Sequence, residues 1–280
     1  ETLSYSKDWE SILRNSRFLS GNDLIALNVR YGKFLGHQIN RFLKNKPKPD
    51  LIASHGHTIF HQPNLGYTLQ IGDINQIAVK TGITTVGDFR SLDVSKGGQG
   101  APLVPIGDEL LFSEYDYCLN LGGISNYSSK KSGERVAKDI SPCNIVSNLL
   151  ANKLGFAYDK GGNLGRQGEV DEDLLTELNK WNYYSAGKSL GMEDLEKEFI
   201  PIIESKSISI ENKLRTYYEH LGQVIGSYMK KKSANTLVTG GGARNLFLVE
   251  CLTDYAESKI IIPSEELIDF KEAVIFALLG

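Results

Sequence analysis

The chain has 280 residues, of which 41% are hydrophobic and 23% charged, with a formal net charge of −3. These values are typical of a globular protein of one large domain or two lobes, and they argue against nucleic acid as the main partner. The three cysteines are far apart, which predicts neither a disulfide framework nor a CxxC metal site: Cys118, Cys143 and Cys251. Without a membrane-length apolar run or a recognisable signal peptide, we expect a cytoplasmic protein with no membrane partner.

The first part of the chain alternates helix and strand signals. A helical apolar stripe predicts a long helix over residues 19–43, capped by Ser20 or Asn22. Short strands are expected in "DLIASHGHT" (50–58), "TLQIGD" (68–73) and "ITTVGDF" (83–89), with a helix over 74–82 that Gly82 closes. The next segment, "SLDVSKGGQGAPLVP" (91–105), reads as a loop with three glycines in four positions.

The rest of the chain again alternates strands and helices, which predicts a layered α/β fold. Strands are expected in "YDYCLNLGGISN" (115–126), around 135–139, in "NTLVTGGGARN" (235–245) and in "SKIIIPS" (258–264). Helices are expected over 142–154, 171–178, 193–204, 210–231, 245–256 and 269–279. The basic run Lys230 to Lys232 would lie at a helix C-terminus and favour its dipole, the alternative being a phosphate-binding patch.

Two strands run directly into glycine turns. The first turn holds Gly122 and Gly123, and the second holds Gly240, Gly241 and Gly242. Glycine lets backbone N–H groups converge on an anion, and a helix N-terminus that follows adds positive potential. Each turn could also be a tight connection between elements, but two such turns favour a nucleotide held between them.

Three histidines and several charged residues are further candidates. His55 and His57 would share one face of an extended segment, close to His61, which suits either a metal site or hydrogen bonding. Asp139 stands between a short strand and a helix, where it could act as a general base or cap the helix. Arg90 could pair with Asp88 or hold an anionic ligand. Glu272, expected one turn into the last helix, could simply compensate the helix dipole.

Five segments together resemble the anhydro-N-acetylmuramic acid kinases in order and spacing: "HGHTIFHQP", "TLQIGD", "TGITTVGDFRSLDVSKGGQGAPLVP", "LNLGGISN" and "TGGGARN". The resemblance implies the two-lobed fold of actin, sugar kinases and Hsp70-type ATPases, with ATP and sugar in a cleft between the lobes. We expect one lobe over 1–113 plus 264–280 on the sugar side, and the other over 114–263 on the nucleotide side. It also implies ATP and Mg²⁺ as cofactors, a sugar as substrate and a role in peptidoglycan recycling. It does not decide the oligomeric state, for which a homodimer is one alternative.

The resemblance also implies roles for single residues. The base of the family lies in an FDTGPGN motif, which reads "KDISPCN" here and places the role on Asp139. The sugar site would be lined by Thr58, Arg90, Gln99, Gly100 and Glu272. Gly122, Gly123 and Asn126 would lie near the phosphates, and Gly240, Gly241, Gly242 and Asn245 around the nucleotide.

The sequence departs from the family pattern at several positions. His57 stands where members usually have Gln, and Lys138, Ile140, Ser141 and Cys143 replace residues of the FDTGPGN motif. The "GTSxDG" hairpin that opens family members and binds phosphate is not found before Glu1. Three readings follow: a kinase that phosphorylates the anhydro-sugar, a non-catalytic sugar- or nucleotide-binding descendant, or part of a longer active enzyme.

Overall fold

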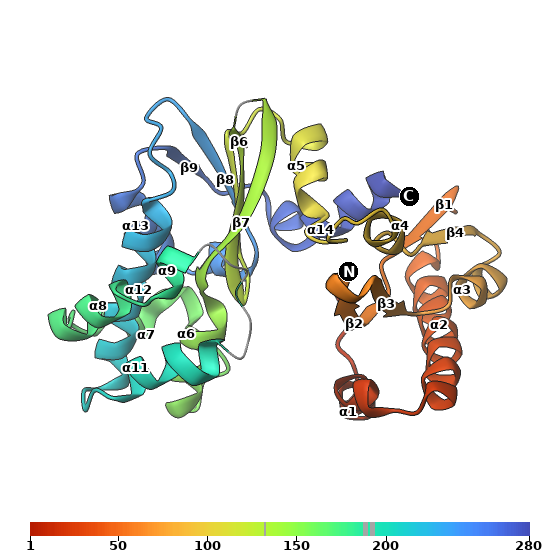
Figure 1. The fold of residues 1–280 in the computed structure, drawn as a ribbon, viewed down its shortest axis with the longest axis horizontal. Coiled ribbons are helices and arrows are strands. Elements are labelled where there is room, and N and C mark those ends of the chain that lie inside the picture. Colours follow the sequence, from red (N-terminus) through yellow and green to blue (C-terminus); the bar gives the residue numbers. More distant parts are fainter. Residues whose placement is uncertain (132, 187–189, 191–193) are drawn as a thin grey trace. The chain divides into compact units, whose positions relative to one another are not determined.

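The computed structural model describes residues 1–131, 133–186, 190 and 194–280. It separates into two compact units (Figure 1). Unit 1 comprises residues 1–107 and 272–280, and unit 2 comprises residues 108–271. The α/β class predicted from the sequence is confirmed. The expected lobe boundaries, at 113/114 and 263/264, differ from the unit boundaries by several residues.

Unit 1 contains two small sheets and several helices. A parallel pair joins β1 to β4, and an antiparallel pair joins β2 to β3. Its elements are α1 (Lys7–Asn15), η1 (Ser16–Phe18), α2 (Gly21–Leu43), β1 (Leu51–Ser54), β2 (His57–Gln62), η2 (Pro63–Leu65), β3 (Tyr67–Ile71), α3 (Ile74–Thr81), β4 (Thr84–Gly87) and α4 (Ser91–Ser95). Two helices run through the unit boundaries: α5 (Val104–Leu111) and α14 (Glu265–Leu279).

Helix α2 begins at the predicted cap, because the Ser20 side chain accepts a hydrogen bond from the Asp23 amide. Two glycines on one face of this helix let α3 pack closely. A Cβ at Gly32 would lie 2.5 Å from the Asp73 carbonyl oxygen, and one at Gly36 would lie 2.8 Å from Lys80 Cβ. Helix α3 ends at Gly82 in the left-handed conformation, as predicted.

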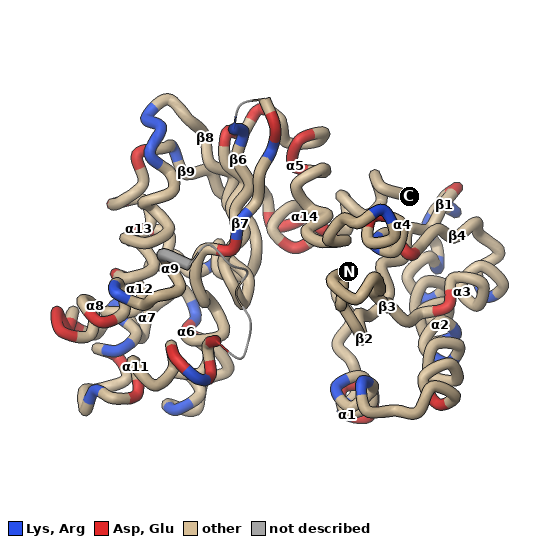
Figure 2. The backbone as a smooth tube through the Cα atoms, in the orientation of Figure 1, with Lys and Arg blue, Asp and Glu red and all other residues tan. Residues whose placement is uncertain are grey.

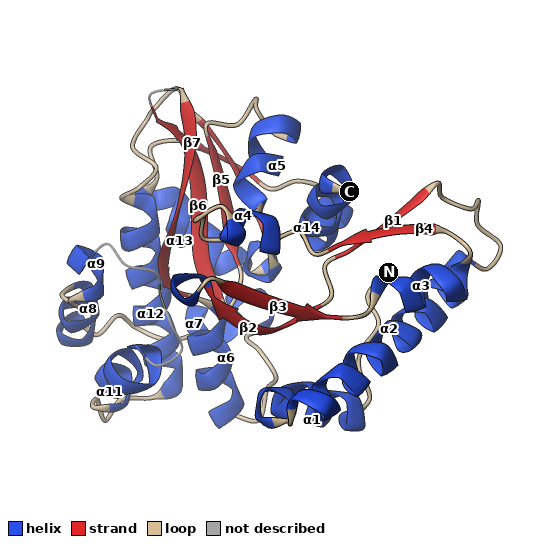
Figure 3. Ribbon diagram, turned by 45° about the vertical axis from the view of Figure 1, so that its right-hand side comes forward, coloured by secondary structure: helices blue, strands red, loops and turns tan. Residues whose placement is uncertain are grey.

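Unit 2 is built on a five-stranded sheet in the order β7-β6-β5-β8-β9, with helices packed against it (Figure 3). Its strands are β5 (Tyr117–Leu121), β6 (Ile124–Lys131), β7 (Glu134–Pro142), β8 (Asn235–Thr239) and β9 (Lys259–Ile261). Its helices are α6 (Asn144–Lys153), η3 (Lys160–Gly162), α7 (Asn163–Arg166), α8 (Glu172–Asn179), α9 (Tyr183–Ala186), η4 (Leu195–Phe199), α11 (Ile200–Glu204), α12 (Ile210–Gly226), η5 (Gly241–Arg244) and α13 (Leu246–Tyr255).

The main hydrophobic core of the protein lies in unit 2. Sheet residues such as Leu119 and Leu121 pack in it with Tyr217 and Leu221 of α12, and all four are fully buried. Small residues again set the approach of helices, because a Cβ at Gly222 of α12 would lie 2.6 Å from the Cys251 carbonyl oxygen of α13. This close packing fixes the approach of α12 to α13.

Several predicted boundaries are corrected. The strand expected over 50–58 is two strands that separate at Gly56, which has φ of +73°. The helix expected from Pro142 begins at Asn144, because β7 continues through Pro142. The start expected at residue 193 lies outside the described residues. Helix α14 begins at Glu265, four residues earlier than expected. The helix dipole acts mainly within the first turn, and Glu272 lies beyond that turn, so dipole compensation does not explain this residue.

The basic run Lys230 to Lys232 does not lie in a helix, contrary to the prediction. Helix α12 ends at Gly226, so the lysines lie in the turn that follows it. Lys231 pairs with Asp116 at 2.6 Å, and Lys230 lies 3.9 Å from Glu257. Basic and acidic residues are interspersed in both units (Figure 2). The three cysteines are buried and unpaired, and no helix in the described ranges is long and apolar enough to span a bilayer.

Candidate active site

In unit 1, Arg90 is held by two hydrogen bonds. It follows β4, and its Nε donates to His55 Nε2 at 3.0 Å, while Nη1 donates to the Gly100 carbonyl at 2.8 Å. The alternative pairing of Arg90 with Asp88 is not what the structure shows, since Asp88 is exposed on a turn with φ of +57°. Burial lowers the pKa of the Arg90 guanidinium, and the nearby charge of Glu272 opposes this shift. The predicted residues Arg90, Gly100 and Glu272 are therefore brought together.

The glycine loop is shorter than the predicted 91–105, because residues 91–95 form α4 and α5 begins at Val104, and it is folded back against α4. Asp93 Oδ2 accepts the Gly100 amide at 2.6 Å, opposite the bond from Arg90 to its carbonyl. A Cβ at Gly100, where φ is +65°, would lie 2.6 Å from Val94 Cγ2, which explains the need for glycine. Both polar groups of this residue are thus engaged in shaping the loop, and Gln99 beside it is exposed.

Thr58 lies on β2 opposite Gln70, and its side chain is exposed. No hydrogen bond between described residues joins Thr58 or Gln99 to Arg90. His55, a candidate for metal binding or hydrogen bonding in the sequence, takes the hydrogen-bonding role here, although it was not among the predicted sugar-site residues. Its ring also packs against Phe276 of α14, one helical turn from Glu272, with the centroids 4.6 Å apart and the planes tilted by 50°. The signal for it was present in the "HGH" motif, but the partner at residue 90 is visible only in three dimensions.

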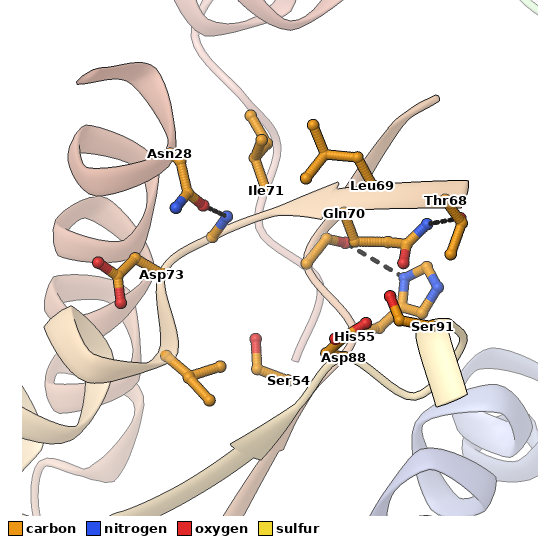
Figure 4. A pocket seen from close by; sticks show the side chains of 13 residues that line it. Asn28, Ser54, His55, Thr68, Leu69, Gln70, Ile71, Asp73, Asp88 and Ser91 are labelled. Atoms are coloured by element: carbon orange, nitrogen blue, oxygen red, sulfur yellow. Dashed lines mark hydrogen bonds between the residues drawn. The ribbon is translucent and has the colours of Figure 1, made fainter. Parts of the chain in front are cut away.

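A cavity of about 250 Å³ lies beside His55 (Figure 4). Its polar lining comes from helix α2, from the end of β1, from β3, from the turns that follow β1, β3 and β4, and from the start of α4: Asn28, Ser54, His55, Thr68, Gln70, Asp73, Asp88 and Ser91. Gln70 Nε2 donates to Thr68 Oγ1 at 2.8 Å, whereas its buried Oε1 finds no hydrogen-bond partner among the described residues. The cavity is therefore polar and offers hydrogen-bond acceptors to a ligand.

The alternative of a histidine metal site is not supported by this geometry. His55 Nε2 accepts the Arg90 hydrogen bond, and its Nδ1 lies 3.2 Å from the Gly56 carbonyl. His57 instead lies edge-on to Tyr31, with ring centroids 6.3 Å apart. In the described ranges, no group of three His, Cys, Asp or Glu side chains is arranged to hold a metal.

In unit 2, a row of polar residues crosses the sheet. Asp139 of β7 pairs with Asn126 of β6, which pairs with Asn120 of β5, and Asn120 pairs with Thr239 at the end of β8. Cross-strand partners share a face of a sheet. A Cβ built at Gly240 would lie 2.4 Å from Asn120 Oδ1, so the row reaches the glycine turn. The predicted base and the predicted nucleotide turn are thus connected through Asn120, which the sequence-based prediction missed.

A β-bulge sets the orientation of Asp139. Ser125 pairs with Ser141 and Asn126 with Asp139, so Ile140 is an extra residue in β7. Bulges often re-aim side chains beside active sites. The Asp139 carboxylate accepts the Leu190 amide at 3.2 Å, and its carbonyl accepts Tyr183 Oη at 3.2 Å. The capping alternative for Asp139 is wrong, because the N-cap position of α6 is Cys143.

The Gly122–Gly123 turn makes a tight connection between elements, one of the two readings that its sequence allowed. The Gly123 carbonyl accepts the amides of Cys143 at 2.8 Å and Ile145 at 3.3 Å, and the Gly122 carbonyl accepts that of Asn144 at 3.1 Å. The turn therefore satisfies the first amides of α6, the groups that would otherwise face an anion.

The second glycine turn packs against the end of β5. A Cβ at Gly242 would lie 2.7 Å from Leu121 Cβ, whereas one at Gly241 would meet only Asn144 Nδ2 at 3.7 Å, so Gly241 is the open position. Asn245 caps α13 by accepting the Leu248 amide at 3.0 Å. The sequence-based prediction missed Gly161 and Gly162, whose left-handed turn lies against Asn245.

Comparison with known proteins identifies relatives. A sequence model of the family described as anhydro-N-acetylmuramic acid kinase matches residues 20–280. A protein of that name from Pseudoalteromonas translucida is 32% identical, over 100% of this chain and 79% of its own length. Proteins of the same name from Vibrio parahaemolyticus and Gloeobacter violaceus are 37% and 36% identical, in each case over 82% of this chain. The chain spans 66% of the length of each of these two.

Solved structures show more distant similarity. The ethanolamine utilization protein EutJ from Carboxydothermus hydrogenoformans is 11% identical, with a TM-score of 0.45 over 90% of this chain and 74% of its own. A glucokinase of the ROK family from Streptomyces griseus, solved with glucose and AMPPNP, is 10% identical, with a TM-score of 0.39 over 88% and 86%. On the strength of the sequence matches, the chain belongs to the anhydro-N-acetylmuramic acid kinase family.

Proposed function

We propose that this protein uses ATP to open the 1,6-anhydro ring of anhydro-N-acetylmuramic acid and to phosphorylate O6, giving N-acetylmuramic acid 6-phosphate. The observation that carries the proposal is the polar row in which Asp139, Asn126 and Asn120 lead to the glycine turn at Gly240. Membership of the family supplies the substrate class. We place the reaction in the cytoplasm, as a step that recycles peptidoglycan fragments.

In the proposed reaction, Asp139 takes a proton from water as the water attacks the anomeric carbon. The bond from that carbon to the bridging oxygen breaks, and the oxygen, which becomes O6, takes the γ-phosphoryl group of ATP while ADP leaves. The same oxygen leaves the anomeric carbon and accepts the phosphoryl group. Most of the rate enhancement therefore comes from positioning the reactants and stabilising the charge that develops. The Leu190 amide orients the carboxylate without neutralising it.

The proposal divides the binding work between the units. Unit 1 recognises the sugar through Arg90, Glu272, Thr58, Gln99 and the cavity beside His55, whose acceptors suit sugar hydroxyl and amide protons. Arg90 suits the carboxylate of the lactyl group. Unit 2 binds ATP at Gly122, Gly123, Gly241 and Asn245.

Mg²⁺ is proposed to enter with ATP. Magnesium in kinases is held largely by phosphate oxygens and one or two carboxylates, and it neutralises charge on the transferred group. That mode does not need a preformed cluster of three acidic or histidine side chains, which the described residues lack. The homodimer stays a prediction, which the mass of the protein in solution tests.

The test is incubation of the protein with Mg-ATP and anhydro-N-acetylmuramic acid. We expect one ADP per sugar 6-phosphate, detected by mass spectrometry and phosphorus NMR, and no ADP burst with glucose as the control sugar. Calorimetry on the same samples addresses the alternative of a non-catalytic descendant. Sugar binding without any product would replace the kinase assignment by that alternative.

A further inference from the structure

A chain of hydrogen bonds leads from the bulge of β7 into helix α12. Ser141 Oγ lies 2.9 Å from Tyr184 Oη, and Tyr184 Oη lies 2.8 Å from His220 Nε2. His220 Nδ1 lies 2.6 Å from Asn179 Oδ1 at the end of α8. Ser141 and His220 are fully buried, so each bond replaces contact with water.

Asn179, at the outer end of this series of hydrogen bonds, determines which group donates and which accepts in each bond. Asn179 Nδ2 donates to Gln223 Oε1 at 2.7 Å, which leaves Asn179 Oδ1 as the acceptor. His220 therefore carries its proton on Nδ1 and accepts the Tyr184 hydroxyl proton at Nε2. Ser141 in turn donates to Tyr184. Burial lowers the pKa of His220 to about 3, so the ring stays neutral and the order of donors is fixed at neutral pH.

Ser141, at the inner end of this series of hydrogen bonds, belongs to the β7 bulge that orients the predicted base. Ser141 is two residues from Asp139, and its backbone is also bound, since its amide donates to Ser125 Oγ and its carbonyl accepts from the same hydroxyl. Tyr183, beside Tyr184, donates to the Asp139 carbonyl. The start of α9 is thus bonded to both sides of the extra residue.

We propose that Tyr184 and His220 are positioning residues, which act through Ser141 to hold the β7 bulge and so the Asp139 carboxylate. The inference rests on the proposed function, in which Asp139 is the base. Small displacements of a reacting group cost rate steeply, roughly 10²-fold for about 1 Å, which is why a rigid anchor two residues away has catalytic consequences. Neither side chain touches the substrate in this proposal.

The experiment compares three variants of the protein. Tyr184→Phe removes the central hydroxyl, and Ser141→Ala removes the inner donor. Tyr158→Phe is the control: this exposed tyrosine lies between α6 and η3 and takes no part in the hydrogen bonds that join Ser141 to Asn179. We expect kcat to fall roughly tenfold in each of the first two with both KM values unchanged, no larger fall in their double variant, and no change in the control.

Amide hydrogen exchange over residues 134–142 provides a second readout, which does not depend on turnover. We expect faster exchange there in Tyr184→Phe than in Tyr158→Phe. If the wild-type protein makes no product, the proposed function fails while exchange still decides whether the chain of bonds holds the bulge. A Tyr184→Phe protein that melts earlier but keeps wild-type kcat and wild-type exchange below its melting range would overturn the proposal.

Discussion

Arg90 Nε donates a hydrogen bond of 3.0 Å to Nε2 of His55, which links the loop after β4 to the turn between β1 and β2. The bond requires the neutral imidazole with its proton on Nδ1, where the Gly56 carbonyl accepts it. Burial and the neighbouring guanidinium both lower the pKa of His55, so this state prevails at neutral pH. The arrangement leaves Arg90 fixed in direction, and no hydrogen bond between described residues uses its Nη2.

Replacing Arg90 with lysine tests this arrangement. A single ammonium lacks the fork that reaches His55 and the Gly100 carbonyl together, so the loop loses one anchor. We expect the KM for the sugar to rise roughly tenfold, about 1.4 kcal/mol, with the KM for ATP unchanged. Steady-state kinetics measure both, with Arg41→Lys at an exposed position of α2 as control. Equal increases in both KM values would contradict a role confined to the sugar.

Asp139→Asn tests the base. The amide oxygen can still accept the Leu190 amide, so we expect the variant to fold and to bind sugar and ATP. Loss of a general base commonly lowers kcat by about 10²–10⁴-fold, and we expect a fall in that range. Product formation is measured by mass spectrometry, beside Asp254→Asn, an exposed carboxylate of α13. Undiminished turnover by Asp139→Asn would remove this residue from the mechanism.

His220 makes stability depend on pH. Its pKa is about 3 when folded and 6.5 in the reference state, so between these values the unfolded chain binds a proton that the folded chain does not. Stability is therefore full above the unfolded pKa and declines as pH falls, by up to about 1.4 kcal/mol per pH unit. From about pH 7 to about pH 5 we expect the wild type to lose roughly 2 kcal/mol more than His220→Gln. Urea unfolding followed by Trp181 fluorescence, in a Trp9→Phe background, measures the difference. Parallel pH profiles would show that His220 does not carry this dependence.

The pair Asp108 and Lys271 tests the cost of an uncompensated buried charge. Their charged atoms lie 2.6 Å apart and both side chains are buried, at the first and last residues of unit 2. Lys271→Met leaves the Asp108 carboxylate buried with only the Ser128 hydroxyl, so we expect a loss of about 3–5 kcal/mol. Asp108→Asn with Lys271→Met should recover most of it. Denaturant titration compares them, and a single variant as stable as the wild type would contradict this expectation.

Part of the site could be predicted from sequence because it rests on local chemistry. The strand that runs into the turn at Gly240, the Gly82 cap and the place of Asp139 in a strand that leads to a helix are all carried by neighbours in the chain. The roles of Gly122 and Asn245 could not be separated in this way. Gly122 connects β5 to α6 through its carbonyl, and Asn245 caps α13 with its side chain. A strand that runs into glycines has the same sequence pattern whether the turn binds a nucleotide or only connects two elements.

The sequence by itself determined the α/β class, the family and the candidate residues, because strand and helix periodicity and motif spacing are written along the chain. Only the tertiary structure decided which residues meet. The contact of His55 with Arg90 spans 35 positions, and that of Tyr184 with His220 spans 36. The register that sets Asp139 opposite Asn126 depends on one extra residue in β7. Such contacts arise from packing and strand pairing, in which no single segment carries the information about its partner.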